Sequence, residues 1–212
     1  MSEVKHRDSN LELYRIIVML AIVVHHYVVN SGLMSSVNED GWTTRSVFYL
    51  SFGMWGKIGI NCFVLITGYY MCNSQITLRK FLKLLLQVEF YNIVIYAIFV
   101  LMGYEQFSIK EAIKGLWLVH SVSGGFIECF LLFYLIIPFM NILIKGMNRK
   151  MHLLLVSYLL FIYSFLASMP MITVDSNYMV WFCVLYFLAS YIRLYQPRWI
   201  RYLSHLGGGD FC

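Results

Sequence analysis

The feature that most constrains this sequence is a series of six long apolar segments, separated by short connections that carry most of its charge. A helix needs about 20 apolar residues to cross a bilayer, and each segment approaches that length. The segments are Leu13–Asn30, Ser46–Tyr70, Leu84–Gly103, Phe126–Ile144, Met151–Ser168 and Tyr178–Tyr195. Of the 212 residues, 60% are apolar or aromatic and 13% are charged. The core of a water-soluble protein could not bury so many apolar side chains. We predict an all-α fold, a polytopic transmembrane helix bundle of about six spans that forms one domain over residues 1–212.

The basic residues alternate across the connections and predict the orientation of the chain in the lipid bilayer. On one side they are Lys5, Arg7, Arg79, Lys80, Lys83, Lys145, Arg149, Lys150, Arg193, Arg198 and Arg201. On the opposite side they are Arg45, Lys110 and Lys114. Because cytoplasmic loops of membrane proteins carry the excess of Lys and Arg, the amino terminus is predicted to be cytoplasmic.

The composition argues against two other classes of site. The net charge of +5 comes from residues spread over short loops, with no basic stripe interleaved with exposed aromatic residues, so nucleic-acid binding is not expected. The five cysteines show no CxxC spacing, and most lie inside apolar segments. Neither a zinc site nor a disulfide framework is therefore predicted.

Ionisable side chains inside the spans are costly in lipid and usually face the bundle interior or an aqueous cavity, so each is a functional candidate. In the first four segments these residues are Arg15, His25, His26, Lys57, Glu89 and Glu128. Glu128 lies near the outer end of the fourth segment, at about the depth expected for His26. Its carboxylate either orients that imidazole or pairs with Lys57, and the sequence leaves both alternatives open. Glu89 lies near the middle of its span and has no partner that the sequence identifies.

Arg15 and His26 are eleven residues apart in the first segment. On an α-helix this spacing corresponds to three turns plus roughly 20° of rotation, and to about 16 Å along the axis. The two side chains are therefore expected to share a helix face, whereas His25 points elsewhere. Taken alone, Arg15 could as well be an arginine that extends to the membrane interface as one that lines a cavity. Taken alone, His26 more commonly makes a structural hydrogen bond to a neighbouring helix. The shared face favours one cavity lined by both, with the histidine able to act as a base.

Three basic residues, Arg79, Lys80 and Lys83, precede the third segment. Arg79 and Lys83 are one helical turn apart, and Gln87 continues their face. Such a patch suits phosphate groups. Ordinary positive-inside residues produce the same pattern, and from these residues alone that interpretation is favoured.

Three motifs carry a resemblance to a known family. The run LYRIIVMLAIVVHHY contains an arginine and, eleven residues later, a histidine, here Arg15 and His26. The run GKIGINCFVLITGYYM contains Gly59, Phe63, Gly68 and Tyr69, and the run LLFYLIIPFMN contains Pro138 and Asn141. Together these motifs resemble the membrane-bound acyltransferase 3 family, whose members modify exported glycans and other molecules with acetyl or related groups. The similarity extends over residues 10–196.

The resemblance implies that the chain is an acyltransferase of a cell membrane, expected to be a bacterial plasma membrane. It implies transfer of an acyl group, expected to be acetyl, from acyl-CoA on the cytoplasmic side to a hydroxyl of a polysaccharide or lipid-linked glycan. His26 is then the expected general base, with Glu128 as the second catalytic candidate. The expected donor-binding residues are Arg15, Arg79, Lys80 and Lys83. No bound cofactor or metal is expected, because acyl-CoA is a substrate.

The sequence departs from the family pattern in three places. The family tends to have two arginines where this chain has Lys80 and Lys83, which lack the bidentate fork of a guanidinium. Where many members have an aromatic pair, this chain has Gly124 and Gly125, which affects the expected acceptor contacts. Members usually have about ten helices, and the glycine-rich end, Leu206–Cys212, resembles neither a finished helix nor an ordinary polar terminus. We therefore expect a truncated or frame-shifted chain.

Two alternatives stay open at this point. A transporter or glycan exporter would use the same His and Glu residues as a polar pathway or proton relay, and it would not need to bind coenzyme A. An inactive fragment that only assembles with other membrane proteins is the second alternative, and it rests on the carboxyl end.

Overall fold

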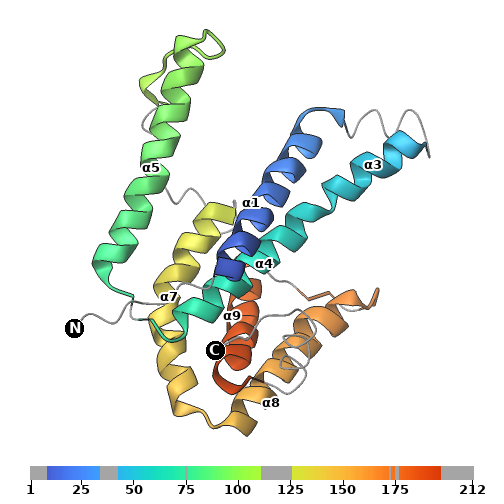
Figure 1. Cartoon of the computed structure of the whole chain (residues 1–212), viewed down its shortest axis with the longest axis vertical. Coiled ribbons are helices and arrows are strands. Elements are labelled where there is room, and N and C mark those ends of the chain that lie inside the picture. Colours follow the sequence, from blue (N-terminus) through green and yellow to red (C-terminus); the bar gives the residue numbers. More distant parts are fainter. Residues whose placement is uncertain are drawn as a thin grey trace. The chain divides into compact units, whose positions relative to one another are not determined.

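The computed structural model describes residues 9–33, 43–74, 76–110, 126–171, 173–174 and 177–196, and every regular element within these ranges is helical (Figure 1). The α-helices are α1 (Ser9–Asn30), α3 (Thr44–Gly53), α4 (Trp55–Met71), α5 (Leu78–Leu101), α7 (Phe126–Gly146), α8 (Arg149–Leu160) and α9 (Tyr178–Tyr195). A π-helical turn, η1 (Phe161–Phe165), and a 3₁₀ turn, η2 (Leu166–Ser168), continue α8. The predicted all-α fold is confirmed.

Six stretches in the described part of the chain are long and apolar enough to cross a membrane, as the sequence predicts. They are Asn10–Asn30, Thr44–Met71, Leu78–Leu101, Phe126–Gly146, Arg149–Ser168 and Tyr178–Tyr195. The largest boundary difference is in the third span, which begins at Leu78 rather than at Leu84. The cause is that hydropathy falls at charged residues, whereas a helix continues through them into the interface with no loss of backbone hydrogen bonding.

The chain divides into two compact units, residues 1–70 and residues 71–212, and each is described by itself. The single domain expected from the sequence stays a prediction. Gly124, Gly125, Lys114, Arg198 and the end of the chain from Leu206 to Cys212 lie outside the described residues.

The first unit is a pair of spans, of which the second is interrupted. Span two consists of α3 and α4, and Met54 lies between them in a turn that keeps a helical backbone (φ −72°, ψ −22°). Helix α1 packs closely against this span because two glycines leave room for it. A Cβ on Gly59 would lie 2.7 Å from Cγ1 of Ile22, and both Gly56 and Gly59 are buried. Small residues that allow close backbone approach are the usual packing surface between membrane helices.

The second unit is built around α7 and α9, which pack through large aromatic side chains. Phe133, Phe182 and Tyr186 are fully buried. The ring of Phe133 meets those of Phe182 and Tyr186 at centroid distances of 5.8 Å in each case, both edge to face. This is a favourable arrangement of aromatic quadrupoles. Helix α5 is linked to α7 by stacking of Phe81 on Tyr134, with centroids 6.4 Å apart.

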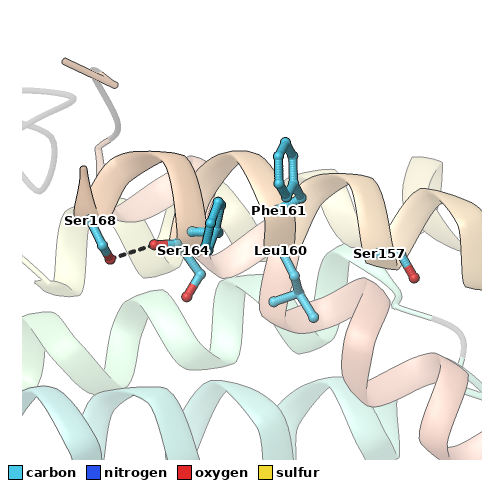
Figure 2. A pocket seen from close by; sticks show the side chains of 6 residues that line it. Ser157, Leu160, Phe161, Ser164 and Ser168 are labelled. Atoms are coloured by element: carbon cyan, nitrogen blue, oxygen red, sulfur yellow. Dashed lines mark hydrogen bonds between the residues drawn. The ribbon is translucent and has the colours of Figure 1, made fainter. Parts of the chain in front are cut away.

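Helix α8 packs against α9, and an open groove lies along the end of α8 and its continuation (Figure 2). The groove has a volume of about 640 Å³, and its lining residues are Ser157, Leu160, Phe161, Ser164, Phe165 and Ser168. Within it, the Ser168 hydroxyl donates a 2.6 Å hydrogen bond to the carbonyl of Ser164. The Ser168 hydroxyl therefore supplies a donor to a backbone carbonyl of the π-helical turn, where that turn passes into η2.

Candidate functional site

The first unit brings together two of the sequence motifs at Arg15. The guanidinium carbon of Arg15 lies 5.4 Å from the centre of the Phe63 ring, so the arginine of α1 contacts the phenylalanine of the α4 motif. The neighbouring Tyr14 hydroxyl donates a 3.1 Å hydrogen bond to the sulfur of Cys62. A cation over an aromatic face retains much of its charge for another ligand while its position is restricted. Arg15 is otherwise exposed, and its predicted role in donor binding stays a prediction.

The two adjacent histidines of α1 have different surroundings. Nδ1 of His25 makes a hydrogen bond with the carbonyl oxygen of Gly53, the last residue of α3, and His25 is half-buried. His26 is exposed, and its ring lies against that of His25 with centroids 5.3 Å apart at 66°. His25 is therefore the histidine that packs on span two, whereas His26 is exposed on α1.

Arg15 and His26 lie on one uninterrupted α-helix, so the eleven-residue spacing keeps the angular relation expected from the sequence. Both side chains are exposed, whereas Val18 between them is buried. The single cavity expected to be lined by both side chains stays a prediction. The role of His26 as a general base stays a prediction.

The basic residues of the expected donor site lie in the first two turns of α5 in the second unit. Arg79, Lys80 and Lys83 are all exposed. The Nζ of Lys80 lies 3.4 Å from the Ser74 hydroxyl, in the connection that precedes α5. Arg79 and Lys83 fall on one helix face because they are four residues apart. The arrangement presents three cations at one helix end, where an anionic ligand also gains from the positive end of the helix dipole.

A hydrogen-bonded pair of buried residues, Asn141 and Tyr186, holds the connection before α5 in place. Nδ2 of Asn141 donates to the carbonyl oxygens of Met71 at 3.1 Å and Ser74 at 3.5 Å. The hydroxyl of Tyr186 donates to Oδ1 of Asn141 at 2.7 Å. Asn141 therefore supplies hydrogen-bond donors to the carbonyls of Met71 and Ser74. In lipid, a backbone carbonyl without a donor would be costly in free energy.

Only half of this pair carries a signal in the sequence. Asn141 belongs to one of the family-like motifs, so it is identifiable, but its partner is not. Tyr186 lies in a continuous apolar segment and has the appearance of any core aromatic residue. Beside the pair, burial raises the pKa of the Cys72 thiol, and the charge of Arg193 partly opposes this. Burial therefore favours the protonated form of this thiol.

His152 is a buried polar residue that the sequence reasoning misses, because it lies at the very start of the predicted fifth span. It is fully buried, and its Nε2 lies 3.1 Å from the carbonyl oxygen of Phe187 and 3.4 Å from the Ser190 hydroxyl. The rings of Tyr191 and Tyr195 surround it at centroid distances of 5.4 and 5.7 Å. These contacts join α8 to α9, so His152 has a structural role.

The carboxylates of the spans belong to the second unit. Glu128 is half-buried in the first turn of α7. Its pairing with His26 or with Lys57, both in the first unit, stays a prediction, as does its catalytic role. Glu89 is 8% exposed near the middle of α5, and neither of its carboxylate oxygens has a hydrogen-bond partner among the residues that the structure describes. No group of three metal-ligating side chains occurs among those residues either.

Comparison with known proteins identifies the family. The acyltransferase domain family, acyltransferase 3, matches residues 8–206, which is nearly the whole chain. No curated protein sequence and no solved structure gives a significant match. The matched range contains Arg15 with Phe63, the two histidines and the Asn141–Tyr186 pair. The six membrane-spanning helices and the match over almost all of the sequence agree, and the chain belongs to the membrane-bound acyltransferase 3 family.

Proposed function

We propose that this protein transfers an acetyl group from acetyl-CoA to a hydroxyl of a polysaccharide or lipid-linked glycan of the cell envelope. The observation that carries the proposal is the acyltransferase domain match over residues 8–206. The contact between Arg15 and Phe63 supports it, because it joins the motifs of the first and second spans. The proposed location is a bacterial plasma membrane with the amino terminus in the cytoplasm.

The proposed donor-binding residues are Arg79, Lys80 and Lys83 at the basic start of α5 in the second unit, and Arg15 in the first unit. Arg79, Lys80 and Lys83 would attract the phosphates of acetyl-CoA at the cytoplasmic face, where the positive-inside rule puts them. Asn141 and Tyr186 support this site indirectly, because they hold the connection that Lys80 contacts through Ser74. The acyl arm would then extend along the membrane normal, away from the charged end.

The proposed chemistry is a direct transfer with His26 as the general base. His26 takes the proton of the acceptor hydroxyl while the oxygen of that hydroxyl forms a bond to the thioester carbonyl carbon. The carbon–sulfur bond then breaks, and the coenzyme A thiolate leaves and takes up a proton. Glu128 is the second catalytic candidate. A neutral imidazole is needed at the start of this sequence, because only an unprotonated ring nitrogen can accept the hydroxyl proton.

The test combines binding with chemistry. The protein in lipid nanodiscs should bind acetyl-CoA, and cells that express it should carry alkali-labile acetate on their envelope polysaccharide. The His26→Ala variant, present at the same level in the membrane, should bind acetyl-CoA but add no acetate. A wild-type protein that binds no acetyl-CoA would contradict the proposal and favour an exporter, which has no need of that ligand.

A further inference from the structure

His25 is the polar side chain that joins α1 to the interruption in the second span. Its Nδ1 is hydrogen-bonded to the carbonyl oxygen of Gly53, where α3 ends. Because a carbonyl oxygen only accepts, the proton of this bond must reside on Nδ1. The bond therefore selects one ring tautomer and one ring orientation, as second partners of functional histidines do elsewhere.

Gly56 holds the other side of the same ring. It is buried, and a Cβ built on it would overlap the imidazole carbons and Nε2 of His25. The imidazole thus packs directly on the α4 backbone, one turn beyond the carbonyl to which it is bonded. Hydrogen bond and backbone contact together leave the His25 ring little freedom to rotate.

His26 follows in sequence and meets this immobilised ring. The two rings are in edge contact, with centroids 5.3 Å apart. Successive side chains of an α-helix differ by about 100°, so His26 does not reach the Gly53 carbonyl or the surface of Gly56. The ring of His25 therefore occupies space on one side of His26 and limits the rotamers open to it.

We propose that His25 is a positioning residue: by anchoring α1 at the Gly53–Gly56 turn, it holds His26 in the orientation in which it removes the acceptor proton. The inference rests on the proposed function, because it requires His26 to be the general base. A misplacement of about 1 Å at a reacting group can cost about a hundredfold in rate. A fixed neighbouring ring and a fixed helix break oppose such a misplacement.

Three substitutions of His25 separate the anchor from the bulk of the ring. An asparagine amide carries its nitrogen on Cγ, as Nδ1 is carried, so His25→Asn retains a donor for the Gly53 carbonyl. His25→Gln carries its nitrogen at the Nε2 position instead, and His25→Ala has no donor. We expect the Ala and Gln variants to lose about tenfold or more in kcat, with KM for acetyl-CoA unchanged, and the Asn variant to recover most of the loss.

The glycines provide a matched pair of controls on the same helix. Gly56→Ala should displace the imidazole and reproduce the kcat loss of His25→Ala. The double variant should be no worse than either single variant, because both remove the same anchor. Gly59→Ala instead crowds Ile22, whose Cγ1 lies 2.7 Å from the added Cβ position. It should lower the thermal midpoint while kcat per folded molecule stays close to that of the wild type.

The measurement is acetyl transfer per correctly inserted molecule, together with the thermal midpoint, for wild type and each variant. Three results would overturn the positioning role: an Asn variant as slow as the Ala variant, a normal kcat in His25→Ala with only the midpoint lowered, or a Gly59→Ala variant as slow as Gly56→Ala. If wild type is active, His26→Ala is inactive and His25→Ala is normal, the inference alone fails. If wild type itself transfers no acetyl group, the proposed function fails and the inference with it.

Discussion

The two units of the molecule hold their helices together by different means. In the first unit, α1 contacts span two through glycine backbone and a few directional contacts, namely His25 with Gly53 and Arg15 with Phe63. In the second unit, α7 and α9 interlock through buried aromatic rings. The burial of these two helix pairs differs accordingly, since 11% and 28% of the apolar windows of the first and second spans are buried, compared with 44% for α7 and for α9.

The proposed general base, His26, lies in the unit whose helices are joined by directional contacts. Lipid offers no hydrophobic force between helices, so association depends on packing area or on specific polar contacts. The α7–α9 pair uses area, provided by fully buried rings such as those of Phe133, Phe182 and Tyr186. The pair formed by α1 and span two uses specific contacts and leaves Arg15 and His26 exposed on the surface of α1. Loss of function and loss of stability are therefore expected to result from substitutions in different units.

The largest effect is expected for His26→Ala in the first unit. Removal of a general base should lower the rate of acetyl transfer at least about a hundredfold, which corresponds to about 2.7 kcal/mol in the activation free energy. The thermal midpoint and acetyl-CoA binding should change little, because His26 is exposed and does not pack on span two. Normal turnover per inserted molecule of the His26→Ala variant would show that His26 is not the general base. The proposed functional difference between the two units would then be wrong.

A core substitution in the second unit should have the opposite signature. Phe133→Ala removes a fully buried ring from between α7 and α9 and leaves a cavity. At about 24 cal/mol per Å³ of cavity, the expected loss is about 2 to 3 kcal/mol of unfolding free energy. Phe139→Ala on the same helix is the control, because Phe139 is 67% exposed. Equal losses in a detergent unfolding titration would show that the aromatic core does not carry the stability of this unit.

A smaller effect is expected where the second unit uses a polar contact. Asn141→Ala removes the donors to the carbonyls of Met71 and Ser74, at an expected cost of about 0.6 to 2 kcal/mol. Tyr186→Phe removes a single bond to Asn141 and should cost less. Because Tyr186 acts through Asn141, the double variant should lose less stability than the sum of the two single variants. Strict additivity in a thermal unfolding cycle would show that the two residues act independently.

The smallest effect is expected for the exposed lysines at the start of α5. Changing Lys80 and Lys83 to Ala should weaken acetyl-CoA binding by on the order of 1 kcal/mol, because exposed charge pairs are worth little each. The effect should shrink as salt is raised. Changing Lys145 and Lys150 to Ala removes the same charge from a different connection and serves as the control. Equal effects of the two pairs would indicate a general positive-inside charge and no donor site.

Part of this molecule could be predicted from the sequence because the bilayer imposes a simple rule. A span must be helical, because every backbone group needs an internal partner, and it must be about 20 residues long. Length and hydropathy therefore sufficed to locate six spans, with the main error at Leu78, where charged residues continue a helix. The eleven-residue relation of Arg15 and His26 was equally accessible, because it depends only on helix geometry along one uninterrupted element.

The packing of the helices against one another could not be predicted from the sequence, because apolar segments of similar composition can pack in many ways. Periodicity separates His25 from His26 by about 100°, but only the position of Gly53 and Gly56 shows that His25 is the one bonded to span two. Tyr186 and His152 are likewise unremarkable in sequence, and their roles come from Asn141 and from the Phe187 carbonyl. The sequence by itself determined the spans and the candidate groups along each helix. Tertiary structure decided which of these groups are held by a neighbour and which are left exposed, because a hydrogen bond depends on distances between helices that hydropathy does not encode.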